Sequence, residues 1–162
     1  MSRLESFIRR LSAQKDCIDR AAEMIGDREG PIVELGLGNG RTYDHLRERF
    51  PGRDIFVFDR AVKAHPDCVP PADRLILGEF RDTLAAAPAR VGRGVVFAHC
   101  DTGSGDRTAT AAQAAWLGAA LKPLLAAGAI VASDQPLEPS LYEALALPNS
   151  VKPGRYFLLR VR

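Results

Sequence analysis

Residues 31–40 read PIVELGLGNG, an apolar run that stops at three alternating glycines. An apolar run with β-branched residues predicts a buried strand, and glycines directly after it predict a tight turn. Beyond the turn, Tyr43, Leu46 and Phe50 are spaced along one side of a helix. The stretch therefore predicts a strand, a turn and a helix, which is the repeating unit of an α/β sheet.

The same rhythm continues along the chain. Apolar runs predict further strands at 54–59, 74–77, 94–101, 129–133 and 155–162, and the segments between them predict helices at 81–87, 106–126 and 138–147. Strands that are apolar throughout are typical of parallel sheets covered on both faces, and right-handed crossovers make such sheets doubly wound. We expect an α/β fold with a single doubly wound, mostly parallel sheet and helices on both faces.

An amphipathic helix precedes this core. Ser2 and Glu5 have the spacing of a capping box, and Gly26 can end the helix. Its apolar residues recur on one face: Leu4, Phe7, Ile8, Leu11, Ile18, Ala22 and Ile25. With 162 residues the chain is expected to form one domain, with the N-terminal helix at 1–26 and a Rossmann-like core at 31–162.

Composition narrows the class of protein. The chain is 46% hydrophobic and 26% charged, which is typical of a globular domain. A net charge of +2 gives no broad basic surface, so a nucleic-acid partner is not expected. Neither a signal peptide nor a membrane span is expected, because Lys122 and Pro123 interrupt the most apolar region. Three isolated cysteines, Cys17, Cys68 and Cys100, fit free thiols in a cytoplasmic protein.

Topology also predicts where a ligand binds. In doubly wound sheets, ligands bind at the carboxyl ends of the strands. The residues at these ends are rich in glycine and polar types: Gly36–Thr42, Asp59-Arg60, Gly78–Phe80, His99–Thr102 and Ser133–Gln135. A glycine turn before a helix favours an anionic group such as a carboxylate or phosphate. A nicotinamide site of the GxGxxG type would need glycine where Arg41 stands, which weakens that alternative.

The segment ELGLGNG, residues 34–40, resembles the E/D-x-G-x-G-x-G signature of class I S-adenosylmethionine-dependent methyltransferases. Strand order and spacing extend the resemblance from about residue 31 to the C-terminus, and the layout is similar to short bacterial methyltransferases of unestablished substrate. It implies that Gly36, Gly38 and Gly40 make room for the methionyl and ribose parts of S-adenosyl-L-methionine, and that S-adenosyl-L-homocysteine is the product. Glu34 would organise the methionyl ammonium group, directly or through water. Three neighbouring polar residues are expected to contact the cofactor: Asn39, Arg41 and Thr42. Gln14 and Lys15 of the N-terminal helix could help to clamp its carboxylate, but a surface role is the favoured alternative for these two.

Two further segments suit an adenosine. Asp59 ends the second predicted strand, next to Arg60, where a carboxylate can accept hydrogen bonds from both ribose hydroxyls. After the third strand, the family resemblance implies that Glu79, between Gly78 and Phe80, accepts the adenine amino group. Alternatively, Phe80 belongs to the core and Glu79 only starts a helix.

Catalytic candidates end the fourth strand, which in the family faces the methyl group. His99 or Asp101 could deprotonate a small-molecule O or N nucleophile. Alternatively, His99 is a half-buried imidazole with satisfied hydrogen bonds, and Asp101 caps the turn at 102–106. In metal-using relatives, acids after the fourth and fifth strands hold a divalent cation. Here Gln135 follows Asp134 in place of a better ligand, so we expect no metal.

The sequence leaves three questions open: the function, the place of the sixth strand and the oligomeric state. An NAD-dependent oxidoreductase and a non-catalytic S-adenosylmethionine-binding sensor or regulatory protein are the alternative functions. Family members usually end with two strands, but only 155–162 is convincing here, so the sixth strand is either missing or hidden in 147–151. A truncated sheet edge and the absence of a lid favour a homo-oligomer.

Overall fold

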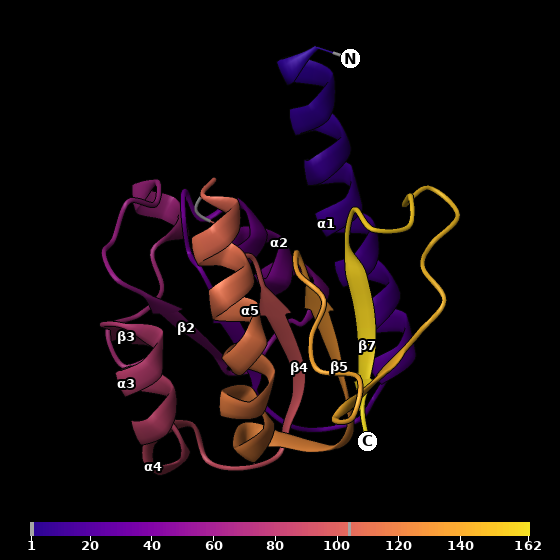
Figure 1. The fold of residues 1–162 in the computed structure, drawn as a ribbon. Coiled ribbons are helices and arrows are strands. Elements are labelled where there is room, and N and C mark those ends of the chain that lie inside the picture. Colours follow the sequence, from indigo (N-terminus) through magenta and orange to yellow (C-terminus); the bar gives the residue numbers. More distant parts are fainter. Residues whose placement is uncertain (1, 104) are drawn as a thin grey trace.

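A twisted central sheet organises the computed structural model, which describes residues 2–103 and 105–162. Within these residues the sheet has seven strands in the order β3-β2-β1-β4-β5-β7-β6 (Figure 1). Five strands are parallel: β1 (Ile32–Leu35), β2 (Ile55–Asp59), β3 (Leu75–Leu77), β4 (Val95–Cys100) and β5 (Leu125–Ser133). β7 (Phe157–Val161) runs antiparallel between β5 and β6 (Tyr142–Ala144). The predicted fold class is confirmed.

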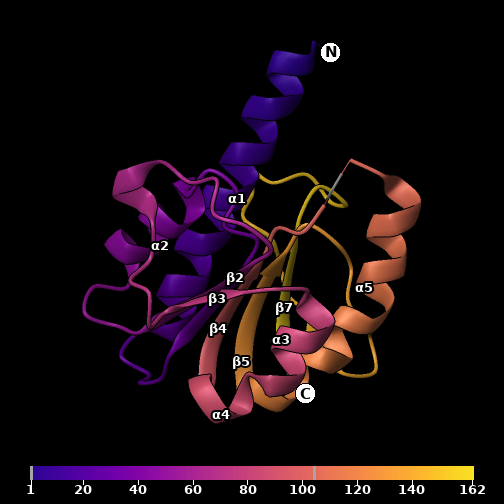
Figure 2. The same ribbon diagram turned by 90° about the vertical axis from the view of Figure 1, so that its left-hand side faces the viewer.

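Helices cover both faces of the sheet (Figures 1 and 2). One face carries α1 (Arg3–Ile25) and α2 (Arg41–Arg49), and the other carries α3 (Phe80–Ala86), α4 (Pro88–Val91) and α5 (Arg107–Leu121). Two short 3-10 helices complete the elements, η1 (Pro66–Cys68) and η2 (Lys122–Leu124). Side chains of the central strands point to two hydrophobic clusters, one on each face, so that Ile32 packs on the α1 face and Val33 on the α5 face. Among the described residues, no helix is long and apolar enough to cross a membrane.

The N-terminal helix begins as predicted but is only partly buried. Ser2 Oγ accepts a hydrogen bond from the Glu5 amide at 3.0 Å, and the Glu5 carboxylate accepts one from the Ser2 amide, which completes the capping box. The second half of α1 packs on β4, β5 and β7. The first half projects beyond the sheet (Figure 1), and there Leu4, Phe7 and Ile8 are exposed. The predicted apolar face of α1 is therefore core only in its second half.

The region after β5 differs from the prediction. The helix expected at 138–147 is wrong, because a turn there leads into the short strand β6. Tyr142 explains the difference, since its ring is buried and its hydroxyl donates to the Gly118 carbonyl at 2.7 Å. Its backbone pairs with Val161 of β7. The sixth strand is thus neither missing nor placed at 147–151. The sheet edge is therefore not truncated, and it gives no support for a homo-oligomer.

Prolines account for smaller differences in boundaries. The long helix predicted at 106–126 ends at Leu121, and Pro123 is the second residue of η2, which follows directly. The helix predicted at 81–87 is followed at once by α4, which starts at Pro88. Proline lacks an amide hydrogen and clashes with the preceding turn, so it terminates a helix or starts a new one.

Candidate active site

Three glycines follow β1, and the structure gives them different surroundings. Gly36, Gly38 and Gly40 all have positive φ, at 95°, 52° and 85°. A Cβ on Gly36 would lie 2.3 Å from the Asp101 carbonyl oxygen, and one on Gly40 would lie 2.4 Å from the Cβ of Cys68. A Cβ on Gly38 would meet nothing within 4 Å. Gly36 and Gly40 therefore allow close packing within the protein, and Gly38 faces open space that a ligand could use.

A pocket of about 220 Å³ opens beside this turn, between α1 and the loop after β4. It brings together seven residues predicted for the site: Gln14, Gly36, Gly38, Asn39, Arg41, Thr42 and Asp101. Five further residues line it that were not predicted as site residues: Phe7, Arg10, Leu11, Leu37 and Gly103. Lys15, the other helix residue considered for the carboxylate clamp, is paired with Asp19 at 2.7 Å and is not among them.

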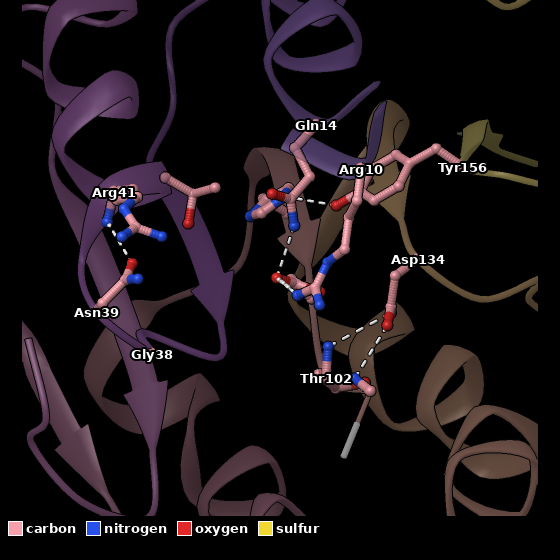
Figure 3. A network of polar contacts seen from close by, with 12 residues as sticks. Arg10, Gln14, Gly38, Asn39, Arg41, Thr102, Asp134 and Tyr156 are labelled. Atoms are coloured by element: carbon pink, nitrogen blue, oxygen red, sulfur yellow. Dashed lines mark hydrogen bonds and ion pairs between the residues drawn. The ribbon is translucent and has the colours of Figure 1, made fainter. Parts of the chain in front are cut away.

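The most highly charged part of the pocket is an ion pair. Nη2 of Arg10 donates to both carboxylate oxygens of Asp101, at 3.0 and 2.7 Å, and Nε2 of Gln14 donates to Oδ2 at 2.6 Å. Figure 3 shows the Arg10 and Gln14 side chains reaching from α1 to this point. Burial lowers the pKa of Arg10, but the charge and hydrogen bond of Asp101 outweigh it and leave that pKa raised. The i, i+4 spacing from Gln14 is the signal that could have identified Arg10.

Asp59 supports the glycine turn from behind. Its Oδ2 accepts the amides of Leu37 at 2.8 Å and Gly38 at 3.1 Å. Its Oδ1 accepts the amides of Arg60 at 2.6 Å and Ala61 at 3.3 Å. These bonds occupy about as many lone-pair sites as a carboxylate has, so Asp59 fixes the conformation of the turn. Its predicted contact with ribose stays a prediction, as does the contact of the exposed Arg60.

A buried polar network lies beneath the pocket. Glu34 and His99 are register partners on β1 and β4, both 0% exposed, with 3.3 Å between Glu34 Oε1 and His99 Nδ1. His99 Nε2 lies 2.6 Å from the hydroxyl of Tyr156, and the Thr42 hydroxyl donates to Glu34 Oε1. Burial raises the pKa of Tyr156 well above its usual value, so this hydroxyl stays protonated and is able to donate to Nε2 of His99. In the tautomer that fits this bond, Nδ1–H of His99 donates to the Glu34 carboxylate.

This network changes the expected role of His99. Both ring nitrogens are engaged and the side chain is fully buried, so His99 does not reach the wall of the pocket as a base would have to. The alternative of a buried imidazole with satisfied hydrogen bonds describes it better. Oε2 of Glu34, by contrast, is buried without a hydrogen-bond partner among the described residues. A buried acceptor of this kind is a position for a ligand donor or a water.

The residues predicted for adenine lie at the end of β3. Gly78 and Glu79 line a separate hollow of about 310 Å³ with Leu77 and Thr83. Phe80 is half-buried and packs against the hydrophobic cluster on the α5 face, which agrees with the core alternative considered for it. The contact of Glu79 with the adenine amino group stays a prediction.

Asp134 follows β5, and its carboxylate lies next to the backbone at Thr102 (Figure 3). It accepts the amides of Thr102 at 3.3 Å and Gly103 at 2.9 Å. Burial raises the pKa of Asp134, and the charge of Asp101 raises it further. The turn for which Asp101 was considered as a cap includes residue 104, which lies outside the described residues. In the described chain, no group of three or more His, Cys, Asp or Glu side chains is placed to hold a metal ion.

The sheet order, the glycine turn after β1 and the charged pocket beside it define a Rossmann-like methyltransferase. Residues 1–161 match the family described as S-adenosyl-L-methionine methyltransferase, and the chain belongs to that family. It is therefore an enzyme that uses S-adenosyl-L-methionine and releases S-adenosyl-L-homocysteine. Neither the NAD-dependent alternative nor the non-catalytic one is favoured by this membership.

Solved structures agree with the family. An S-adenosyl-L-methionine methyl transferase from Silicibacter pomeroyi DSS-3 is 40% identical, with a TM-score of 0.94 over 100% of this chain and 99% of that one. The sugar N-methyltransferase KedS8 from Streptoalloteichus sp ATCC 53650 shares the fold at 19% identity and a TM-score of 0.55, over 83% of this chain and 55% of that one. MycE of the mycinamycin pathway, crystallised with Mg and S-adenosylhomocysteine, shares the fold at 15% identity and a TM-score of 0.56, over 88% of this chain and 44% of that one. No curated protein matches the chain.

Proposed function

We propose that this enzyme methylates an oxygen or nitrogen of a small molecule that approaches the carboxyl edge of the sheet beside the loops after β4 and β5. The chain carries a net charge of only +2, which gives no broad basic surface and favours a small acceptor over a nucleic acid. The sugar N-methyltransferase among the structures of the same fold adds support for the acceptor class.

The residues around the pocket fit the cofactor in two respects. Gly38 leaves open space beside the turn, and Oε2 of the buried Glu34 has no hydrogen-bond partner among the described residues. S-adenosyl-L-methionine supplies a methyl group already activated on a sulfonium, so the protein mainly needs to orient the reactants and exclude water. Glu34, Gly38, Asn39, Arg41 and Thr42 are the residues we assign to that binding, with Asp59 holding the turn.

Asp134 is the residue we assign as proton acceptor, and its environment is the observation that carries the proposal. His99 is fully buried, and the carboxylate of Asp101 is held by Arg10 and Gln14. Asp134 instead is partly exposed, and among the described residues it has no ion pair; its oxygens accept the amides of Thr102 and of Gly103, a residue of the pocket wall. Its raised pKa makes it a better base near neutral pH than an ordinary aspartate.

A screen of small-molecule acceptors tests the proposal. Amines, amino sugars and phenols would be incubated with S-adenosyl-L-methionine, and S-adenosyl-L-homocysteine release would be measured. With an acceptor in hand, Asp134→Asn should lower kcat by roughly 10²–10⁴-fold and leave S-adenosylhomocysteine affinity unchanged. Glu138→Gln, an exposed acid in the same loop, is the matched control. Methylation of only RNA or protein would refute the acceptor class, and an unchanged kcat in Asp134→Asn would refute the base.

We also propose a cytoplasmic location and self-association. Cys17, Cys68 and Cys100 are free thiols, and burial raises the pKa of Cys17 to about 12, which keeps it protonated and unreactive.

The exposed Leu4 and Ile8 on the projecting half of α1 support a homo-oligomer. Sedimentation over a range of protein concentrations tests this, and a monomer at every concentration would contradict it.

A further inference from the structure

The charges that line the pocket match one end of the cofactor. Among its described lining residues, Asp101 is the one carboxylate, and Arg10 and Arg41 are the two cations. Arg41 lies over the ring of Phe7, 5.8 Å from its centroid, and none of the described ion pairs joins it to Asp101. Among the described residues, Arg10 is the cation that pairs directly with Asp101. The amino-acid end of S-adenosylmethionine likewise carries one carboxylate and one ammonium group.

We propose that the Arg10–Asp101 ion pair occupies the place of this amino-acid end in the free enzyme and opens when the cofactor binds. Asp101 then accepts hydrogen bonds from the ammonium group, and Arg10 donates to the carboxylate. The inference rests on the assignment of this pocket to the cofactor. It gives Arg10 and Asp101 a shared role, which is to select ligands that carry a complete amino acid.

The two partners of the pair differ in how firmly they are held. Asp101 directly follows β4, its side chain is 16% exposed, and Gln14 holds it independently at 2.6 Å. Arg10 is 46% exposed and extends from the half of α1 that projects beyond the sheet (Figure 1). Arg10 can therefore swing away without disturbing the core, while Gln14 keeps Asp101 in position.

Pocket size supports the same exchange. A volume of about 220 Å³ lies below the range of roughly 300–1,000 Å³ that ligand sites usually have. Separation of Arg10 from Asp101 would enlarge the pocket at its α1 side. The closed ion pair thus accounts for a site that is too small as it stands.

Charge neutrality makes the exchange selective. Removal of Arg10 from Asp101 leaves a mostly buried carboxylate without its counter-ion, which is unfavourable unless another cation replaces it. A ligand with an ammonium and a carboxylate replaces both partners at once, and each new contact is charge-assisted. A nucleoside such as 5′-methylthioadenosine offers neither group. It must either bind with the pair closed or leave Asp101 unpaired.

Calorimetric titrations with two ligands test this selectivity without any methyl acceptor. S-adenosylhomocysteine and 5′-methylthioadenosine would be titrated into the wild type, Arg10→Met, Asp101→Asn and the control Arg9→Met. Arg9 is exposed on α1 and lines a groove other than this pocket. We expect Arg10→Met and Asp101→Asn each to weaken S-adenosylhomocysteine binding tenfold or more, with 5′-methylthioadenosine binding unchanged or improved. Arg9→Met should leave both affinities at the wild-type value.

The outcomes separate this inference from the assignment of the cofactor. If wild-type protein fails to bind S-adenosylhomocysteine, the cofactor assignment itself fails. If it binds, and the two variants keep the wild-type preference between the ligands, the ion-pair inference is overturned while the assignment stands. Equal weakening of both ligands would also overturn it, because Arg10 would then have a structural role only. A crystal structure with S-adenosylhomocysteine should show Arg10 detached from Asp101, and an intact pair would contradict the exchange.

Discussion

A matched pair of substitutions in the glycine turn separates folding from binding. In Gly38→Ala the new Cβ meets open space, so the cost to folding is that of a left-handed alanine, about 1–2 kcal/mol. In Gly40→Ala the same strain adds to a Cβ placed 2.4 Å from the Cβ of Cys68 and 3.1 Å from that of Ala64. Overpacking of this kind costs about 1–3 kcal/mol more. We therefore expect a loss of about 2–5 kcal/mol for Gly40→Ala.

The two variants should rank in the opposite order for cofactor binding, with the larger loss of affinity in Gly38→Ala. Gly38→Ala fills space beside the ligand and should weaken S-adenosylhomocysteine binding tenfold or more. Gly40→Ala changes a contact on the far side of the turn, so the fraction that folds should bind within a few-fold of the wild type. Urea denaturation gives the stabilities and calorimetry gives the affinities. Wild-type affinity in a folded Gly38→Ala protein would refute the reasoning, and so would a Gly40→Ala protein as stable as Gly38→Ala.

Three further changes test the surroundings of the turn. Tyr156→Phe leaves Nε2 of the buried His99 unpaired and should destabilise the fold by about 1–3 kcal/mol in urea denaturation; an unchanged midpoint would contradict the network. Asp59→Ala should weaken S-adenosylhomocysteine binding roughly tenfold to a hundredfold in calorimetry, with Asp59→Asn milder, and wild-type affinity in both would exclude the ribose contact. EDTA should leave S-adenosylhomocysteine binding and, once an acceptor is known, turnover unchanged, whereas turnover restored by Mg²⁺ would show that a metal is used.

Prediction from sequence was most reliable where the information is local. The glycine turn, the capping box at Ser2 and the strands of the parallel sheet follow from short patterns, and the structure contains them all. The different roles of Gly36, Gly38 and Gly40 do not follow from such patterns. They depend on Asp101 and Cys68, which lie far along the chain and approach the turn only after folding.

The segment 138–147 shows how tertiary structure overrides a local preference. Its leucines and alanines favour a helix, and Pro139 and Pro148 mark its two ends. In the folded chain, however, the segment pairs with an edge of β7 that would otherwise lack hydrogen-bond partners, and Tyr142 fits a buried position against Gly118. Three residues of β6 satisfy both requirements. No pattern within the segment itself reveals the edge that it must cover.

The position of His99 follows from the period of a strand, which the sequence does contain. β4 ends at Cys100, so His99 lies inside the strand and Asp101 is the first residue beyond it. The register partner of His99 on β1 is Glu34, so the side chains of His99 and Glu34 point to the same face of the sheet. Thr42 of α2 and Tyr156 contact them there. Because His99 and Thr42 both contact Oε1 of Glu34, only Oε2 remains free among the described contacts. Glu34 is therefore held and oriented by its neighbours in the sheet and by Thr42, and among the described residues its second carboxylate oxygen has no hydrogen-bond partner.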